Sequence, residues 1–347
     1  MHFKAPDIGL DLGTCNTVVY VKNEGIVISE PTLVISRRGD KKPIAVGEDA
    51  QRMYGRTSDA EIAIHPIRNG MIANYDATVL LLRAFISKAV GESNLVKPRL
   101  VMSIPSEIDE VNRKALTAAV RACGLKKVYL IEKPLAAAIG AGLSVFEPEG
   151  CMVVDVGGGT TEVAVVSLGG LVVSQSIPVG GVKMDEAIVN HIKHEFKMLI
   201  GAKTAEDVKL DLASALPQEN GSSVRIRGRD LLSPSALEID YTAQQAYGAV
   251  REPCRAILTA IKWVLERTPP ELASDIMKNG IYLTGRAAQL YALDQYIANE
   301  LNIQVILAKD PGDCTVLGLG YIVENLALLA QQLSLIHISE PTRPLYI

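Results

Sequence analysis

The feature of this sequence that most restricts its fold is a short motif that occurs twice. Its first copy is Asp11-Leu12-Gly13-Thr14-Cys15-Asn16-Thr17 and its second is Asp155-Val156-Gly157-Gly158-Gly159-Thr160-Thr161. In both copies an apolar run that predicts a buried strand ends in aspartate, and a β-branched run after the turn predicts a returning strand. Helices follow each copy, among them one expected at residues 184–200 and a last one at residues 315–332. A polar insertion also accompanies each copy, at residues 31–70 and from about residue 201 to about residue 240. The pattern predicts an internal duplication with two α/β lobes.

The motif also predicts a chemistry. Glycine lets the backbone approach an anion closely and take positive φ, so that consecutive N–H groups can cradle phosphate oxygens. A carboxylate beside a phosphate is repulsive unless a hard divalent cation separates them, and Mg²⁺ that keeps several waters is the natural choice. Two ordinary hairpins are the alternative interpretation, but two copies at matching positions favour a metal–nucleotide complex held between the lobes.

Composition excludes several classes of protein. The 347 residues are 48% hydrophobic and 21% charged, with a net charge of −4, which is typical of a globular protein of two or three domains. We expect no nucleic acid partner, because no basic stripe is interleaved with aromatic residues. The five scattered cysteines favour reduced thiols in a cytosol. Neither a signal peptide nor an apolar run of about 18 residues is present, so we expect a cytoplasmic protein with at most peripheral membrane attachment.

The two motifs match the superfamily of actin, heat-shock chaperones and sugar kinases, and longer stretches resemble the MreB family of bacterial actins. The resemblance runs from about residue 8 to about residue 329. It is carried by residues 11–17, 152–167, 226–232 and 268–277. It implies an α/β fold of duplicated actin-like (ribonuclease H-like) lobes, with four subdomains around a central nucleotide cleft.

The same resemblance implies subdomain boundaries. Subdomain IA comprises residues 1–30, 72–143 and 315–332, subdomain IB residues 31–71, subdomain IIA residues 144–180 and 242–314, and subdomain IIB residues 181–241. Residues 333–347 do not resemble the family, and we interpret them as an extraneous extension.

The resemblance implies that the chain binds ATP or ADP with Mg²⁺ and polymerises with itself. The filaments are expected at the inner face of the cell membrane, where they determine rod shape and guide wall synthesis together with membrane proteins of cell-wall elongation. Two alternatives remain open. One is a soluble phosphotransferase or phosphohydrolase on the same fold, and the other is a degenerate member that acts as a scaffold without hydrolysing ATP.

Site residues follow from the family's motifs. Asp11 and Asp155 are expected to hold magnesium through water. The expected phosphate contacts are Thr14, Cys15, Asn16, Thr17, Gly157, Gly158, Gly159 and Thr160. The expected ribose and base contacts are Glu206, Asp207, Val208, Lys209, Gly285, Arg286, Ala287 and Ala288. Without the family, Glu206 and Lys209 would be an ordinary exposed pair on a helix.

The sequence departs from the family at its catalytic position. The family has Glu-Glu-Pro, whereas this chain has Glu132-Lys133-Pro134. An ammonium cannot accept a proton from the attacking water, so we expect a weak ATPase at most, with Lys133 facing the γ-phosphate. Thr160 belongs to the same catalytic set, and Glu132 is the alternative base.

Two further departures concern the nucleotide. The adenosine motif Gly-Gly-Gly-Ala is replaced by Gly285-Arg286-Ala287-Ala288, where Arg286 is expected to stack on adenine. Val182 replaces an aspartate expected after Gly180-Gly181.

Two smaller signals have ordinary interpretations. His191 and His194 are three residues apart on an expected helix, where a solvated face is favoured over a metal pair because no third ligand is evident. Residues 94–96 correspond to a loop that touches the membrane in the family, and packing on their own domain is equally compatible.

Overall fold

The computed structural model describes residues 6–37, 42–55, 60–91, 97–218 and 221–329. The chain divides into two compact units. The first contains Met1–Pro148, Ser167–Leu171 and Asp313–Ile347, and the second contains Glu149–Val166 and Val172–Gly312. Each unit carries one copy of the duplicated motif. The finer division into four subdomains stays a prediction.

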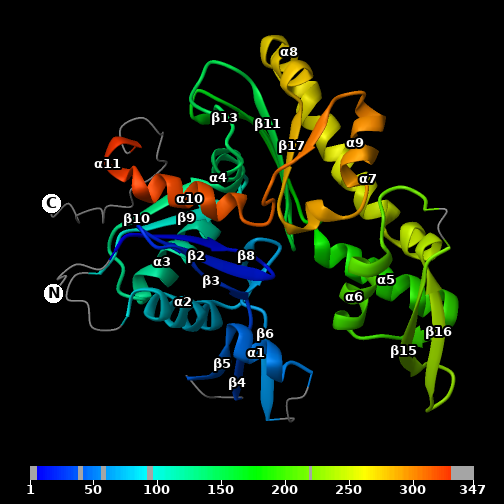
Figure 1. Ribbon diagram of the computed structural model, residues 1–347. Coiled ribbons are helices and arrows are strands. Elements are labelled where there is room, and N and C mark those ends of the chain that lie inside the picture. Colours follow the sequence, from blue (N-terminus) through cyan, green and yellow to red (C-terminus); the bar gives the residue numbers. More distant parts are fainter. Residues whose placement is uncertain (1–5, 38–41, 56–59, 92–96, 219–220, 330–347) are drawn as a thin grey trace. The chain divides into compact units, whose positions relative to one another are not determined.

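The first unit is built on a five-stranded sheet of order β10-β9-β1-β2-β3, with a small sheet of order β5-β4-β6 and the hairpin β7-β8 (Figure 1). Its strands are β1 (Ile8–Leu12), β2 (Asn16–Val21), β3 (Gly25–Pro31), β4 (Val34–Arg37), β5 (Pro43–Val46), β6 (Glu61–Ile64), β7 (Ile67–Arg68), β8 (Met71–Ile72), β9 (Leu100–Ile104) and β10 (Val128–Glu132). Its helices are α1 (Gly47–Met53), α2 (Tyr75–Val90), α3 (Glu110–Ala122), α4 (Lys133–Gly140), α10 (Cys314–Glu324) and α11 (Leu326–Leu329).

The second unit is built on a five-stranded sheet of order β13-β12-β11-β17-β18, with a small sheet of order β14-β15-β16. Its strands are β11 (Cys151–Val156), β12 (Thr161–Ser167), β13 (Gly170–Ile177), β14 (Met198–Leu199), β15 (Ser223–Asp230), β16 (Ala236–Thr242), β17 (Ile281–Thr284) and β18 (Val305–Leu307). Its helices are α5 (Gly181–Phe196), α6 (Ala202–Leu212), α7 (Ala243–Arg267), α8 (Pro270–Asn279), the short 3₁₀ helix η1 (Arg286–Gln289) and α9 (Leu293–Leu301).

The two large sheets have the same strand order when each is read outward from its motif strand. β1 pairs antiparallel with β2 and parallel with β9, and β11 pairs antiparallel with β12 and parallel with β17. The motif strands are apolar on both faces, as expected of central strands that are covered on both sides. Each sheet has its own buried core. The predicted internal duplication is confirmed.

Helix α4 is held against α10 by an unusually close backbone approach, and the two helices lie side by side in Figure 1. A Cβ atom on Gly140 would lie 1.8 Å from the carbonyl oxygen of Cys314, and one on Gly318 would lie 1.9 Å from that of Ala136. Both distances are far below any real contact, so only glycine fits at either position. The crossing therefore fixes the place of α4 in the first unit.

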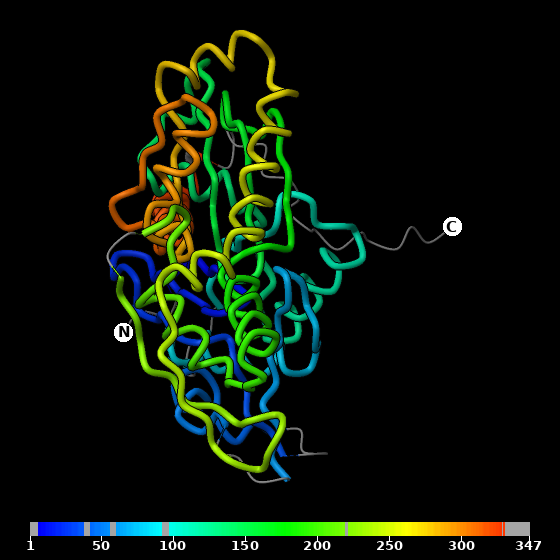
Figure 2. The backbone as a smooth tube through the Cα atoms, turned by 90° about the vertical axis from the view of Figure 1, so that its right-hand side faces the viewer, coloured from blue at the N-terminus to red at the C-terminus, as the bar shows by residue number. Residues whose placement is uncertain are grey.

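Three elements differ from their predicted bounds. The last helix, expected to run unbroken over residues 315–332, ends at Glu324, and α11 begins at Leu326. The helix expected at residues 184–200 begins three residues earlier, at Gly181, because loop carbonyls accept its first N–H groups. The polar stretch after residue 201 contains α6 and the long hairpin β15–β16, which both views show (Figures 1 and 2). Among the residues described, no helix is both long and apolar enough to cross a membrane.

Candidate functional site

Both copies of the duplicated motif form the same tight turn after their strand. In the first loop the N–H of Gly13 donates to the carbonyl oxygen of Asn16 at 3.1 Å, and in the second the N–H of Gly157 donates to that of Thr160 at 2.9 Å. The flanking strands pair in the same register in both units. The two loops are thus one backbone structure, built twice.

A hydroxyl group orients the aspartate of each motif. Ser103 Oγ, on β9, donates to Asp11 Oδ1 at 2.6 Å. Thr284 Oγ1, on β17, donates to Asp155 Oδ1 at 3.0 Å. The sequence analysis missed both hydroxyl residues. The signal that could have found them is a single hydroxyl residue near the end of an otherwise apolar strand, at matching places in the two halves.

The first loop is braced by a side chain. Thr32 Oγ1 donates to the carbonyl oxygen of Gly13 at 2.8 Å and lies 2.8 Å from Thr17 Oγ1. The N–H of Thr32 donates to the carbonyl oxygen of Cys15 at 2.8 Å. Thr17, predicted to contact phosphate, is fully buried and helps to build the loop. Thr14 Oγ1 accepts a hydrogen bond from the N–H of Gly70 at 3.1 Å, and Cys15 is exposed.

The second loop is braced by backbone. The N–H of Gly181 donates to the carbonyl oxygen of Gly157 at 3.0 Å, and the N–H of Val182 donates to that of Gly158 at 2.9 Å. A Cβ atom on Gly180 would lie 2.4 Å from the Gly157 oxygen, so glycine is required where the chain enters α5. Val182, which replaces the aspartate expected at this position, thus contributes its backbone N–H to the loop.

Lys133 lies beside the aspartate of the first motif. Its Nζ is 3.8 Å from Asp11 Oδ2, and the two side chains are 16% and 14% exposed. This distance is that of an ion pair without a direct hydrogen bond, in a place that water screens less than an open surface. The ammonium therefore balances the charge of Asp11 locally. The predicted contact of Lys133 with a γ-phosphate stays a prediction.

Glu132 ends β10 directly before Lys133. Its carboxyl is half-buried, and this burial raises its pKa above the usual range. A carboxylate with a raised pKa is a better proton acceptor than an ordinary one. The role of Glu132 as the alternative base stays a prediction that this environment favours.

The donor sets of the two loops fit magnesium to different degrees. Asp155 is 2% exposed and oriented by Thr284, beside three glycines, which fits a magnesium ion held through water. Asp11 is oriented in the same way by Ser103 but fits less well, because the Lys133 ammonium faces its second oxygen. The residues described contain no cluster of three metal-binding side chains.

Four of the residues predicted to contact ribose and base lie on α6, at residues 206–209. Lys209 Nζ lies 2.8 Å from Asp185 Oδ1 in an ion pair without hydrogen-bond geometry, and it donates to the carbonyl oxygen of Gly181 at 3.3 Å. Burial raises the pKa of Asp185, and the Lys209 ammonium offsets part of that rise. Lys209 therefore reaches the start of α5, at the second loop.

The other three predicted residues of α6 face either the solvent or the core of the second unit. Glu206 and Asp207 both pair with Lys203 on the solvated face of α6, at 3.6 and 2.7 Å. Val208 is 1% exposed and packs in the core of the second unit. The side chain of Val208 therefore serves the core of the second unit.

The predicted adenosine motif forms η1. The N–H of Gly285 donates to the carbonyl oxygen of Pro311 at 2.6 Å, which anchors the start of this short helix. Ala287 packs on the core of the second unit and Ala288 is buried in it. Arg286 is exposed, with its stem close to Gly312. Stacking of Arg286 on adenine stays a prediction.

Two other features lie apart from the loops. His191 is half-buried, with Nδ1 2.9 Å from Tyr241 Oη, so the expected solvated face is wrong for this residue.

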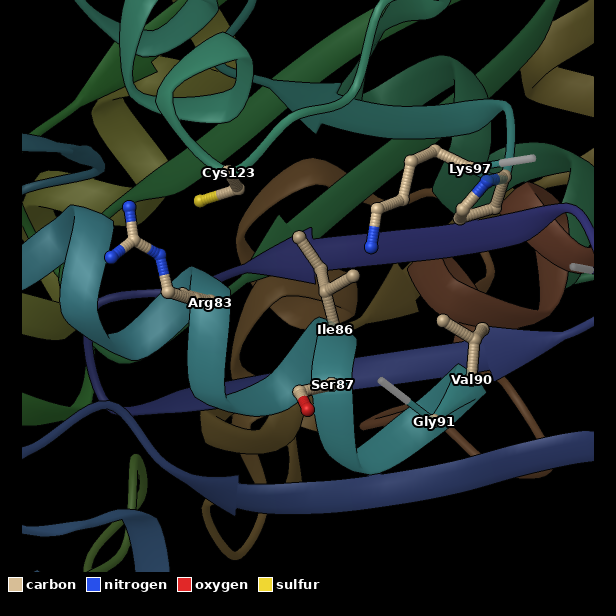
Figure 3. Close-up of a pocket in the computed structure, with 8 residues that line it drawn as sticks. Arg83, Ile86, Ser87, Val90, Gly91, Lys97 and Cys123 are labelled. Atoms are coloured by element: carbon tan, nitrogen blue, oxygen red, sulfur yellow. The ribbon is translucent and has the colours of Figure 1, made fainter. Parts of the chain in front are cut away.

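A pocket of about 280 Å³ lies at the C-terminal ends of α2 and α3 (Figure 3). Arg83, Lys97 and Cys123 line it, together with apolar residues of α2, and it contains no predicted site residue. Residues 94–96 and the tail 333–347 lie outside the described residues.

Comparison with known proteins identifies close relatives. The family model described as MreB/Mbl protein matches residues 5–331. The chain is 44% identical over 328 residues to the cell shape-determining protein Mbl of Bacillus subtilis (strain 168), covering 94% of this chain and 98% of that protein. It is 42% identical over 325 residues to the cell shape-determining protein MreB of Escherichia coli (strain K12), covering 92% and 94%.

Solved structures agree with these relatives. MreB5 of Spiroplasma citri bound to ADP superimposes with a TM-score of 0.89 at 32% identity, covering 95% of this chain and 99% of that one. The same protein bound to AMPPNP gives 0.88 at 32%, covering 94% and 98%. The MamK double helical filament gives 0.75 at 18% identity, covering 91% and 98%, which supports the fold alone. The predicted actin-like α/β fold is confirmed.

Proposed function

The chain belongs to the MreB/Mbl family, and from this premise we propose that it binds an adenine nucleotide and forms filaments that determine cell shape. The observation that supports nucleotide binding is the pair of matching loops. Each presents the same hydrogen-bonded turn beside an aspartate that a hydroxyl group orients. Backbone N–H groups in such turns suit phosphate oxygens. The relative from Spiroplasma citri, 32% identical, carries ADP or AMPPNP in its solved structures.

Magnesium accompanies the nucleotide in this proposal. Asp155 would hold it through water, where it would neutralise charge that develops on the phosphates. Thr284 keeps the carboxylate of Asp155 oriented, and the backbone braces keep the second loop in shape. Asp11 would be a weaker ligand, since its charge is already balanced in part.

Filament formation is the second part of the proposal. Actin-like subunits stack head to tail, a contact that repeats without closing and so produces open filaments. The match to the MreB/Mbl family model and the names of the relatives support self-assembly in the service of cell shape. We place these filaments in the cytoplasm at the inner face of the cell membrane, with membrane proteins of cell-wall elongation as partners.

Hydrolysis is proposed to be slow. Lys133 cannot accept a proton, and it stands where the family carries the glutamate that polarises water. A specific observation thus also favours the second candidate function, a scaffold that keeps its nucleotide. The ammonium of Lys133 faces a carboxylate rather than open solvent, as a retained structural charge would.

Nucleotide binding is tested by calorimetric titration of ATP or ADP onto the full chain, once with Mg²⁺ present and once with Mg²⁺ chelated. Saturable binding at a ratio of one nucleotide per chain is expected. No heat and no protection against thermal unfolding, with either nucleotide under either condition, would refute nucleotide binding.

Filament formation is tested by sedimentation and electron microscopy over a series of protein concentrations, with and without lipid vesicles. A critical concentration and visible polymers are expected. A chain that binds nucleotide yet stays monomeric at every concentration, with lipid present, would remove the cytoskeletal part of the proposal and leave nucleotide binding intact.

A further inference from the structure

Lys133 occupies an unfavourable position for a cation. It is the first residue of α4, where the unsatisfied N–H groups of the helix end create a partial positive charge. The side chain of Glu132, which precedes the helix, makes no capping hydrogen bond there. A lysine at this place is therefore stabilised by a partner outside the helix, and Asp11 is such a partner.

The Asp11 side of the pair is fixed in orientation. Ser103 donates to Oδ1, which directs Oδ2 toward the ammonium of Lys133. Both charged side chains are mostly shielded from water, so the attraction between them is screened less than that of a surface pair. The carboxylate thus has a positive charge beside it before any ligand arrives.

The lysine side is fixed at its backbone. The crossing at Gly140 and Gly318 holds α4 in place, and Pro134 restricts the backbone directly after Lys133. The lysine stem is flexible, with four carbons before the charge. The ammonium can therefore turn from the carboxylate toward an anion at the first loop while α4 stays where it is.

We propose that Lys133 is an internal cation of the first phosphate loop, which takes over part of the charge balance that magnesium would supply at Asp11. This inference rests on the proposed function and concerns the same site. Without nucleotide the ammonium pairs with Asp11. With a nucleoside diphosphate or triphosphate bound, it also offsets phosphate charge, so binding persists when free magnesium is low.

The experiment measures the ADP dissociation constant by calorimetry, in excess Mg²⁺ and in EDTA, for the wild type, Lys133→Gln and Lys133→Arg. ADP is used because it has no γ-phosphate to hydrolyse, so the measured dissociation constant reports binding alone. The quantity of interest is the ratio of the constant in EDTA to the constant in Mg²⁺. The ratio should rise about tenfold in Lys133→Gln, the size expected on losing one charge-assisted interaction, and stay near the wild-type value in Lys133→Arg.

Lys126→Gln is the matched control, because Lys126 is an exposed lysine of the same unit and has no place in either loop. Its ratio should equal that of the wild type. An unchanged ratio in Lys133→Gln, with ADP bound normally, overturns the inference and leaves the proposed function standing. No ADP binding to the wild type under either condition overturns both.

A second measurement needs no nucleotide. Denaturant unfolding of Asp11→Asn, Lys133→Gln and the double variant measures the coupling free energy between the two side chains in the ligand-free chain. A double variant that is less destabilised than the sum of the single variants supports the pair. Additive effects would show that the two charges do not interact, and would overturn the inference even if Lys133→Gln alters nucleotide binding.

Discussion

The two phosphate loops have the same backbone and different supports. The second loop receives N–H groups from the main chain of the first turn of α5. The first loop is braced by both the hydroxyl and the N–H of Thr32, and its aspartate faces the ammonium of Lys133. The two copies thus share the turn and differ in the side chains around it. A comparison of substitutions at the two loops should therefore separate what the turn contributes from what its neighbours contribute.

The largest effect is expected from Lys133→Glu, which restores the family's residue. General-base assistance contributes about 10²- to 10⁴-fold to a rate, so single-turnover ATP hydrolysis should rise within that range. Polymers should also disassemble faster, since they would lose their triphosphate sooner. The measurement is a quenched single turnover with Mg²⁺, and Lys126→Glu is the control for the added negative charge.

A different result would reverse the assignment at the first loop. If the wild type already hydrolyses ATP briskly, if Lys133→Ala keeps that rate and if Glu132→Ala abolishes it, then Glu132 is the base. Lys133 would then be a bystander in hydrolysis.

The next effect compares the two aspartates. Asp155→Ala should lose most ATP affinity, about 10- to 100-fold, together with its dependence on Mg²⁺, because the carboxylate that fits the metal is gone. Asp11→Ala should lose less, since Lys133 already balances that charge. Calorimetry with and without chelator measures both. Equal losses would mean that the loops treat magnesium alike, and wild-type affinity that ignores chelation would reject a magnesium role altogether.

The contacts that support the two loops can be compared through the free energy of unfolding of variants that remove them. Gly180→Ala forces a Cβ atom against the Gly157 carbonyl and should cost about 1–3 kcal/mol. Thr32→Val removes the buried hydroxyl that serves Gly13 and should cost about 1–3 kcal/mol, as for a buried group left unsatisfied. Urea unfolding measures both, with Gly248→Ala, on an exposed helix face with open space around it, as the neutral-to-stabilising control. A Gly180→Ala variant as stable as this control would contradict the backbone support.

The smallest effect is a pH dependence at the end of β10. Burial raises the pKa of Glu132 above its ordinary value of 4.5, so the folded chain binds this proton more tightly than the unfolded chain does. The stability that Glu132 contributes is therefore full below about pH 4.5 and lost as the pH rises through the folded pKa. Glu132→Gln should unfold like the wild type at pH 4 and be more stable at pH 8. The gain should be less than about 1 kcal/mol, because water partly screens this half-buried group. Equal unfolding free energies at pH 8 would contradict the buried carboxylate.

The sequence was sufficient for the loops and insufficient for what supports them. Asp11 and Asp155 end apolar strands and precede glycines, which is a local pattern, and the structure builds both turns as predicted. Ser103 and Thr284 escaped notice because they are adjacent only through parallel strand pairing. The Lys133 contact is not a local pattern either, since it joins the start of α4 to a residue 122 positions earlier in the chain.

Boundaries failed where tertiary contacts decide them. Helix α5 starts at Gly181 because loop carbonyls capture its first N–H groups, and glycine has no local preference for that role. Val208 was predicted from family position to serve the nucleotide, yet its side chain belongs to the core. A stretch that matches a motif can thus contribute backbone, side chain or neither, and only packing distinguishes these cases.

The close crossing of α4 and α10 has a consequence for the order in which the chain is made. Helix α10 begins at Cys314, long after α4, so the first unit lacks one of its packing partners until nearly all of its residues have left the ribosome. The second unit draws on residues 149–166 and 172–312 alone and can complete its core during synthesis. The lobe that starts first is therefore finished last. Until then, the surface of α4 that α10 covers in the folded chain stays without this cover.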